Sequence, residues 1–435
     1  MSNLEAMAKG KILSDICPVQ SAEELNGYQL DGLSPEYVVK PKNAAEAAQV
    51  LALAASSKTP AAVTGNGTKF VYGSPLQKLA WVINTAEMVS EPEIKADDLM
   101  VFAQAGLPLS VLQDQLKQKN LFLPVDIGTN GATVGGLLAH GGGSSHRLAY
   151  GLIRDMVLGL TVALTDGKLY KFGGQTVKNV TGYDLRKLFI GSKGTLGVIT
   201  DVCLRVYAIP PAAKVLMVAA DSNDTAFRIA AGLEKLRPAV LEIYDHSLAR
   251  QLFKDLPLNK GSLVLVKYAG PVPLVDKKYQ DALNVLAAHQ AAIVKEFTRQ
   301  DESKIWEERA EFFEAGHAER KEPADICRVK ISVPARETIS IAQALEKAMQ
   351  KNTGYKASLY IPAAGLIYVS YAVTDNQQLL QELSSVIKGK RGFILLEKGP
   401  LKLRRDFYEY PREAWEGRIK EYFDPQMVLN PGKRP

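Results

Sequence analysis

The stretch GTNGATVGGLLAHGGGSSHRLAYG, residues 128–151, carries the strongest local signal in this chain. It holds eight glycines in 24 residues, whereas average usage of about 7% would give roughly two. Apolar and hydroxyl residues interleave with the glycines, so the stretch is not low in complexity. Because glycine lacks a Cβ, its backbone N–H groups can approach another group closely. The stretch therefore predicts a loop that either cradles a ligand or makes tight turns.

A second glycine-rich loop, TGNGT at residues 64–68, follows an apolar strand predicted over 60–63. Neither loop has the GxGxxG spacing of a dinucleotide-binding turn, and neither contains the GK[ST] of a P-loop. Two backbone cradles are nevertheless what a diphosphate cofactor requires, because its charges must be desolvated against N–H donors. Tight turns in a β-rich protein fit the same spacing, so the residues alone leave both interpretations open.

Length and composition limit the class of protein. The 435 residues predict two to three domains. A net charge of +6 is too dilute for a nucleic-acid-binding surface. No apolar run approaches the roughly 18 residues needed to span a bilayer, and the N-terminus lacks a signal-peptide core. The three cysteines, Cys17, Cys203 and Cys327, lie too far apart in sequence for a disulfide scaffold or a cluster motif. We expect a soluble, cytoplasmic protein.

Helix and strand patterns divide the chain. Asn43 and Glu46 form a capping-box-like start for a helix over 44–55. Asp166-Gly167 predicts a hairpin. Strands are predicted over 60–63, 81–84, 99–105, 157–164, 169–172 and 198–206, and a helix over 108–120. The predicted domains are an N-terminal arm without regular pattern (1–35), an α+β domain (36–210), a second domain (211–410) and a C-terminal helix and tail (411–435).

The second domain shows an internal repeat. Strand, helix, strand, strand and helix are predicted at 215–220, 225–236, 239–244, 262–268 and 273–290. The same order returns at 326–333, 337–350, 356–361, 366–373 and 376–388, with a further strand at 392–397. Two units of this kind predict a ferredoxin-like sheet with helices on one face.

Several short segments form a pattern shared with a known family. They are TGNGT (64–68), ATVGG (132–136), YG (150–151), DMVLG (155–159), GSKGTLGVIT (191–200) and the tail FDP…NPG (423–432). With them the chain resembles the FAD-binding oxidoreductases of the vanillyl-alcohol oxidase, or PCMH, type from about residue 36 to 208. The resemblance implies an α+β fold. A PCMH-type FAD-binding domain of two α/β subdomains would precede a ferredoxin-like cap domain.

The resemblance also implies where FAD binds. In the family, the first loop and the ATxGG loop hold the pyrophosphate, GSxGTLG passes the adenine end, and Asn-Pro-Gly returns to the flavin. The positions that inherit these roles are Gly65, Asn66, Gly67, Thr68, Thr133, Gly135, Gly136, Gly194, Gly197, Ile199 and Asn430. Members that attach FAD covalently carry a His in the first loop, where this chain reads Asn66-Gly67-Thr68. We therefore expect non-covalent FAD.

The second domain departs from the family pattern. Related D-2-hydroxy-acid dehydrogenases carry GHxGDGNxH and EHG segments that supply metal ligands and a catalytic His. Here the corresponding stretch 359–368 reads LYIPAAGLIY, and EHG is replaced by Glu397-Lys398-Gly399. The resemblance thus implies no metal and a degenerate site, with Lys398 in the place of the base. A simpler interpretation makes Glu397 and Lys398 an exposed or ion-paired couple.

Two arginines and two histidines remain as candidates. Arg309 lies in WEER (306–309), which is similar to the WxxR of the family, and Arg328 lies in RVK (328–330). Either could bind a substrate carboxylate through a bidentate pair, or lie on a solvated face. His140 and His146 flank the triglycine 141–143. They would lie near the flavin or be ordinary loop histidines.

The string FGGQTVKNVTGYDL (172–185) is similar to the second FAD-binding subunit of bacterial glycolate oxidase. This implies an FAD subunit of a glycolate or D-lactate dehydrogenase complex, serving electron transfer or assembly. A catalytic FAD subunit and an iron–sulfur subunit would be separate chains, and the complex would be cytoplasmic or peripheral at the inner membrane face. Two alternatives stay open. One is a self-sufficient FAD-dependent D-2-hydroxy-acid dehydrogenase with Lys398 or Tyr360 as base, and the other is a binding protein with a structural FAD.

Overall fold

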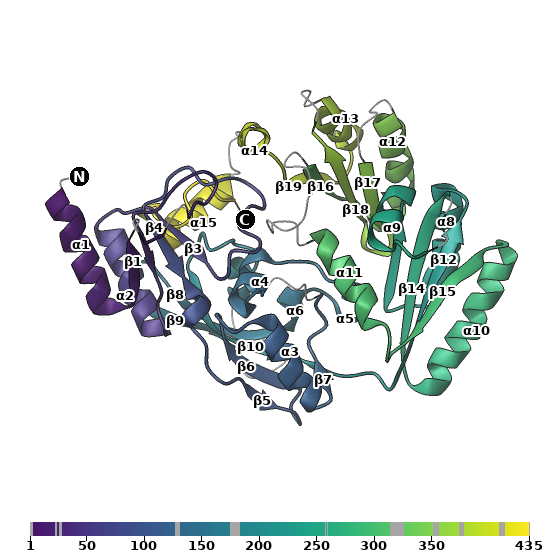
Figure 1. Ribbon diagram of the computed structural model, residues 1–435, viewed down its shortest axis with the longest axis horizontal. Coiled ribbons are helices and arrows are strands. Elements are labelled where there is room, and N and C mark those ends of the chain that lie inside the picture. Colours follow the sequence, from purple (N-terminus) through teal and green to yellow (C-terminus); the bar gives the residue numbers. More distant parts are fainter. Residues whose placement is uncertain are drawn as a thin grey trace. The chain divides into compact units, whose positions relative to one another are not determined.

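The chain forms two compact units in the computed structural model (Figure 1). The first unit comprises Met1–Gly143, Leu152–Ile209 and Tyr408–Pro435, and the second comprises Ser144–Gly151 and Pro210–Phe407. The structure describes residues 3–21, 24–25, 28–126, 131–174, 183–256, 258, 260–313, 326–350, 356–373, 378–408 and 414–434. Most of the string at 172–185 therefore lies outside the described residues.

The first unit contains a four-stranded sheet in the order β1-β2-β4-β3 and a five-stranded antiparallel sheet in the order β5-β6-β10-β8-β9. Strands β2, β4 and β3 run parallel, whereas β1 is antiparallel to β2. The strands are β1 (Val19–Ser21), β2 (Tyr37–Val39), β3 (Ala61–Thr64), β4 (Trp81–Asn84), β5 (Glu93–Lys95), β6 (Met100–Gln104), β8 (Val157–Ala163), β9 (Leu169–Gly173) and β10 (Val198–Arg205). A short pair links β7 (Leu121–Phe122) with β11 (Tyr207–Ala208).

The helices of the first unit begin where local sequence predicts in two cases. Helix α2 (Ala44–Ser56) is capped by the Asn43 side chain, which accepts a hydrogen bond from the Glu46 N–H at 3.0 Å. Helix α3 (Leu109–Gln118) buries three leucines at helical spacing. The predicted hairpin is confirmed as well, because Gly167 adopts φ 78° in the turn between β8 and β9. The remaining helices are α4 (Val134–His140), α6 (Ile153–Met156), α7 (Arg186–Phe189) and α15 (Ala414–Phe423), with the 3-10 turn η1 (Thr85–Glu87).

The N-terminal residues contain regular structure that the sequence pattern did not predict. Helix α1 (Asn3–Ile16) precedes β1, so the expectation of an irregular arm over 1–35 is wrong for this part. Leu13 is fully buried in one cluster with Val39 of β2 and Leu51 of α2. An isolated helix of this length is marginal in water. Packing against α2, and not an apolar stripe of its own, therefore holds α1 in place.

The second unit is built on one eight-stranded antiparallel sheet in the order β15-β12-β14-β13-β17-β18-β16-β19. Each half has the strand order of a ferredoxin-like repeat, and the halves join where β13 pairs with β17. The predicted repeat is confirmed. The strands are β12 (Ala212–Ala220), β13 (Val240–Tyr244), β14 (Ser262–Gly270), β15 (Ala292–Thr298), β16 (Ile326–Ser332), β17 (Lys356–Ile361), β18 (Leu366–Ala372) and β19 (Phe393–Lys398).

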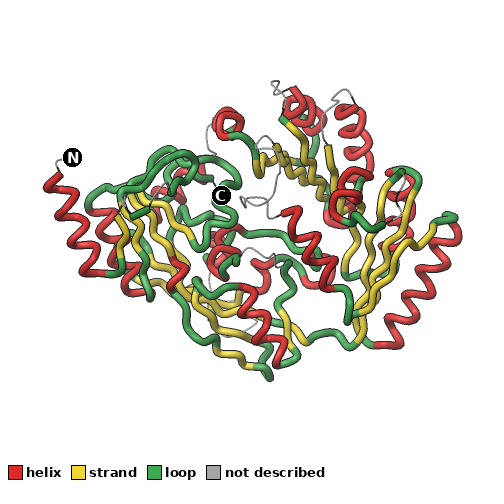
Figure 2. Tube along the Cα trace, viewed as in Figure 1, coloured by secondary structure: helices red, strands yellow, loops and turns green. Residues whose placement is uncertain are grey.

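Helices flank both faces of this sheet, whereas the repeat predicted helices on one face. Figure 2 shows helices beside the strands of each unit. The predicted helices are α8 (Asn223–Glu234), α10 (Val272–Ala288), α12 (Thr338–Gln350) and α13 (Gln378–Ile387), and the additional ones are α5 (Arg147–Tyr150), α9 (His246–Leu252), α11 (Ser303–Phe313) and α14 (Leu401–Phe407), with the 3-10 turns η2 (Ala335–Glu337) and η3 (Pro362–Ala364). Leu248 of α9 and Ile305 of α11 share a core with Met217 of β12. On the opposite face, Phe227 of α8 packs edge-on against Tyr360 of β17. None of the described helices has the length and apolarity needed to cross a bilayer.

Candidate functional site

The two glycine-rich loops of the sequence lie side by side in the first unit. The loop that follows β3 places Gly65 against the side chain of Thr133, leaving no room for a Cβ. Next to this contact, the Asn66 amide donates a hydrogen bond to the Gly131 carbonyl at 2.6 Å. The structure therefore brings together segments that are 65 residues apart.

The backbone of these loops suits an anion. Gly67 and Gly131 adopt φ of 72° and 68°, the left-handed conformation that glycine adopts without strain. No described atom lies within 4 Å of the place where a Cβ of Gly67 would stand. Among the described residues, no acceptor takes a hydrogen bond from the backbone N–H of Asn66, Gly67 or Thr68. Consecutive N–H groups of this kind form anion-binding concavities.

The ATVGG segment begins a helix, although the sequence predicted a loop. Thr133 is the N-cap of α4, and its hydroxyl accepts a hydrogen bond from the Gly136 N–H at 3.1 Å. The Gly135 N–H donates to the Ala105 carbonyl at 2.8 Å. A Cβ on Gly135 would lie 2.7 Å from the Ala105 Cβ. Gly135 thus lets α4 approach the chain after β6, and its N–H is already used within the protein.

The C-terminal tail closes onto the same region. The Asn430 carboxamide oxygen accepts a hydrogen bond from the Val63 N–H at 2.8 Å, and its amide donates to the Lys193 carbonyl. A Cβ on Gly194, which has φ 69°, would lie 2.8 Å from the Asn430 amide nitrogen. Asn430 is 1% exposed. It therefore joins the tail to β3 and to the loop after α7.

Gly197 and Ile199 lie further inside the fold. A Cβ on Gly197 would meet the Ala163 carbonyl oxygen at 2.9 Å. Ile199 is buried in β10 and pairs with Val162 of β8. Both residues therefore contribute to the contact between these two strands.

Two buried lysines that the sequence reasoning missed fix the tail. Lys420 donates hydrogen bonds to the carbonyls of Thr195 at 2.6 Å and Leu429 at 2.9 Å, and it pairs with Asp424. Lys433 pairs with Asp31 at 3.1 Å, and both side chains are almost fully buried. The spacing of Lys420 and Asp424 by four residues on the C-terminal helix was the available signal.

The two histidines beside the triglycine lie in different units. His140, in the first unit, packs edge-on against Tyr72 with ring centroids 5.4 Å apart. His146 belongs to the second unit, where its ring lies 5.2 Å from that of Trp306. Its Nε2 is 3.3 Å from the Lys267 ammonium. Lys267 in turn forms a buried ion pair with Glu302 at 2.8 Å.

Arg309, the candidate for substrate carboxylate binding, forms a bidentate ion pair with Glu242. Its Nε donates to Glu242 at 2.7 Å and its Nη2 donates to the other carboxylate oxygen. The two side chains are 2% and 0% exposed. The Tyr244 hydroxyl donates to the same carboxylate at 2.6 Å. One edge of the Arg309 guanidinium is therefore engaged by a carboxylate of the protein.

Arg328 and Lys398 face each other across neighbouring strands. Arg328 on β16 is opposite Lys398 on β19 and Ser370 on β18. The Arg328 Nε donates to the Ser370 hydroxyl at 3.1 Å, and the arginine is 1% exposed. Two cations thus lie at one position of the sheet, on the same face as Tyr368.

Tyr360 is unsuited to act as a base. Its side chain is fully buried and its hydroxyl donates to Glu346 at 3.2 Å. Burial, together with the charges of Asp245 and Glu346, raises the pKa of Tyr360 well above its ordinary value. A phenolate is therefore strongly disfavoured at this position.

In the described part of the chain no three His, Cys, Asp or Glu side chains converge as metal ligands do.

Two family descriptions match the chain and together cover most of it. The FAD binding domain matches residues 35–173, and the C-terminal domain of FAD linked oxidases matches residues 209–379. The chain belongs to the FAD-linked oxidases. It is an FAD-dependent oxidoreductase, and the PCMH-type α+β fold expected from the sequence is confirmed.

Relatives extend over nearly the whole chain of this FAD-linked oxidase. It is 25% identical over 432 residues to glycolate oxidase subunit GlcD of Bacillus subtilis. That alignment covers 92% of this chain and 88% of the relative. It is 27% identical over 413 residues to a D-lactate dehydrogenase of Archaeoglobus fulgidus, with 91% and 90% covered. A solved alkyldihydroxyacetonephosphate synthase shares the fold, with a TM-score of 0.69, 16% identity and coverage of 100% and 85%.

The first unit of this FAD-linked oxidase fits FAD. Gly67 and Gly131 are left-handed, the backbone N–H groups of residues 66–68 have no acceptor among the described residues, and no described atom lies within 4 Å of a Cβ placed on Gly67, which is what a bound phosphate requires of such a loop. When bound, FAD supplies a two-electron acceptor. In this region the chain contributes backbone N–H donors, which need no rearrangement to bind a negatively charged group.

Proposed function

We propose that this FAD-linked oxidase is an FAD-containing subunit of a complex that dehydrogenates a small 2-hydroxy acid, glycolate or D-lactate, and that it serves electron transfer or assembly. The relatives from Bacillus subtilis and Archaeoglobus fulgidus, matched over more than nine-tenths of this chain, support the substrate class. A catalytic FAD subunit and an iron–sulfur subunit would be its partner chains. We place the complex in the cytoplasm or at the inner face of the membrane, which cell fractionation would test.

The ion pair between Arg309 and Glu242 is the observation that supports assigning substrate oxidation to a partner chain and not to this one. A bidentate arginine is the group best suited to hold a substrate carboxylate. Here a fully buried carboxylate of the protein already occupies its Nε and Nη2. Binding a substrate there would require breaking a desolvated ion pair, which costs several kcal/mol. The arginine therefore supports the fold of the second unit in preference to substrate binding.

In the proposed subunit, FAD is bound non-covalently by the first unit. Its pyrophosphate would lie against the backbone of residues 65–68 and the turn at 131–133, where unused N–H donors and the left-handed glycines meet. The tail would hold this region together through Asn430. Gly135 and Gly136 would act through α4, by its packing and its N-cap, and would not contact the phosphate directly.

A self-sufficient D-2-hydroxy-acid dehydrogenase is the second candidate, and one observation favours it. Arg328 and Lys398 lie in register on one face of the sheet, where two cations could attract a carboxylate and Lys398 could serve as base. Tyr360 does not take that role, since its pKa is raised by burial.

Reduction of the flavin by substrate distinguishes the two candidates. The purified FAD-loaded chain, mixed with excess glycolate or D-lactate, should keep its oxidised spectrum for minutes, and dithionite should bleach it at once. A missing general base alone slows such a step about 10²–10⁴-fold. Adding the co-purifying chains should restore reduction. Bleaching by substrate alone within seconds would contradict the proposal, and Lys398→Ala, compared with Lys402→Ala, would then test the base.

A further inference from the structure

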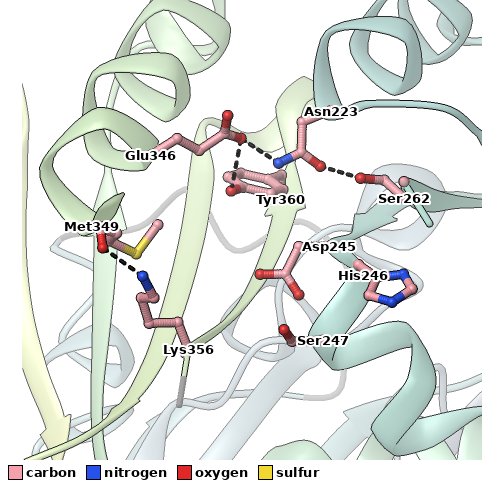
Figure 3. A pocket seen from close by; sticks show the side chains of 10 residues that line it. Asn223, Asp245, His246, Ser247, Ser262, Glu346, Met349, Lys356 and Tyr360 are labelled. Carbon is pink, nitrogen blue, oxygen red and sulfur yellow. Dashed lines mark hydrogen bonds between the residues drawn. The ribbon is translucent and has the colours of Figure 1, made fainter. Parts of the chain in front are cut away.

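The second unit contains an open pocket where its two repeats join. Its volume is about 360 Å³, at the lower end of the range for small-ligand sites. It lies beside the junction of β13 and β17, and Figure 3 shows the side chains that line it. They are Asn223, Asp245, His246, Ser247, Ser262, Glu346, Met349, Lys356 and Tyr360, with Gly261. The pocket takes no part in the function proposed above.

Two carboxyl groups from different repeats line this pocket. Asp245 follows β13 and Glu346 lies on α12. Burial, with a contribution from the charge of Glu346, raises the pKa of Asp245 to about 6. Burial also raises the pKa of Glu346. Above about pH 6 the Asp245 carboxylate is therefore ionised where water compensates its charge poorly.

Neither carboxylate has a cationic partner. Across the described chain, no lysine, arginine or histidine lies at ion-pair distance from Asp245 or Glu346. Elsewhere in the same unit, buried acids are paired, as Glu242 is with Arg309. Charged groups are seldom desolvated without a partner. The acids of this pocket thus differ from the paired acids elsewhere in the second unit.

Neutral hydrogen bonds hold Glu346 in position without neutralising it. The amide of Asn223 and the hydroxyl of Tyr360 both donate to the same Glu346 oxygen, and Ser262 donates to Asn223. Lys356 is the cation of the pocket, and its ammonium donates to the Met349 carbonyl at 2.5 Å. Figure 3 shows Lys356 reaching toward Met349 while Asp245 points into the space below Tyr360. The acids outnumber the cation.

We propose that this pocket binds the ammonium group of a small organic amine through Asp245 and Glu346. An ammonium carries three N–H donors and one positive charge, which complement two carboxylates that lack a cation. An anion would be repelled by the same pair. A divalent metal requires converging ligands, and within the described residues no set of three acids, histidines or cysteines converges.

Calorimetric titration of the full-length, FAD-loaded protein tests the proposal. The ligands are propylamine, 1,4-diaminobutane, alanine, sodium acetate and MgCl₂, compared at constant ionic strength. We expect saturable binding of at least one amine, and none of acetate or Mg²⁺. Binding of alanine in preference to the two amines would identify a zwitterionic source of the same ammonium group. Binding of Mg²⁺ alone, or of no ligand in the series, would overturn the proposal.

Charge-removing variants locate the site. Asp245→Asn keeps the N-cap of α9, because Asn caps as well as Asp, and Glu346→Gln keeps the shape of the side chain. Each should raise the Kd of the bound amine about tenfold or more, the effect of losing one charge-assisted hydrogen bond. Asp276→Asn, an exposed acid on α10, is the matched control and should leave the Kd unchanged. Equal affinity in all three variants would contradict the assignment to this pocket.

Discussion

The two units of this FAD-linked oxidase offer different kinds of chemistry. The first presents backbone N–H groups, with left-handed glycines at residues 67 and 131 and no titratable side chain among residues 65–68. The second presents charged side chains on a sheet, and some of the buried ones pair with each other, as Arg309 does with Glu242. A backbone cradle depends on conformation, whereas a side-chain site depends on which partner each charge takes.

This difference means that the two regions should respond differently to substitution. A cradle survives many substitutions, provided that its glycines remain. A side-chain site loses its chemistry when one residue changes or finds an internal partner. The region around residues 359–368 has no His, and the arginine of the WEER segment is engaged within the fold. We therefore expect the cofactor-binding half to tolerate more substitutions than the substrate half, although both match their family descriptions.

Breaking the buried pair should have the largest effect on stability. Arg309→Met leaves the fully buried Glu242 without a partner, and we expect a loss of about 3–5 kcal/mol in the free energy of unfolding. Urea denaturation followed by tryptophan fluorescence measures it. The double variant Arg309→Met with Glu242→Leu should recover most of the loss, and the exposed Arg336→Met should change little. An Arg309→Met protein that unfolds at the same urea concentration as the wild type would contradict this prediction.

Filling the space between α4 and the strand before it should be the next largest effect. Gly135→Ala places a Cβ 2.7 Å from the Ala105 Cβ, and overpacking of this kind costs about 1–3 kcal/mol. We expect FAD retention to fall, measured as the flavin-to-protein absorbance ratio after gel filtration. Adding Ala105→Gly in the same chain should restore part of it. Undiminished retention in Gly135→Ala would show that α4 does not position the cofactor.

Removing the unpaired charge of Asp245 should stabilise the protein above pH 6. The pKa of Asp245 is raised to about 6, so the folded state binds a proton more tightly than the unfolded chain. The wild type should therefore lose stability as the pH rises from about 4 through 6. Asp245→Asn should gain about 1–2 kcal/mol at pH 7.5 and nothing at pH 4, allowing for solvent screening. Urea titrations at both pH values test this. A variant that is less stable at pH 7.5 would contradict the prediction.

Straining one glycine of the cradle should give the smallest effect. Gly67→Ala finds free space but must adopt φ 72°, which costs about 1–2 kcal/mol. We expect a several-fold weaker FAD affinity by fluorescence titration. Gly417→Ala on α15, where no described atom is near and the conformation is helical, should stabilise the chain slightly and leave FAD binding unchanged. Identical FAD affinities for wild type and Gly67→Ala would remove Gly67 from the cradle.

Much of the fold follows from local sequence. The apolar runs and helical spacings predict the repeat of the second unit, because side-chain periodicity is set by the backbone geometry of each element. The cap at Asn43 and the hairpin at Asp166-Gly167 depend on neighbours within four residues. The ferredoxin-like strand order follows from two such units in series. Helix α1 was not predicted, because its stability comes from packing on α2 and not from a local sequence pattern.

The partners of the site residues required the tertiary structure. Sequence alone marked residues 65–68 and 131–136 as loops that either approach a ligand closely or make tight turns, because glycine preferences are local, but residues 134–136 begin helix α4. It could not show that Gly135 packs on Ala105, or that Arg309 meets Glu242 from 67 residues away. The ion-pair partner of a charged side chain is the group that the fold places beside it. Local sequence does not indicate which distant residue that will be. The sequence therefore determined where the glycine-rich segments lie, whereas the tertiary structure decided that Gly135 packs within a helix and that Arg309 is paired with Glu242.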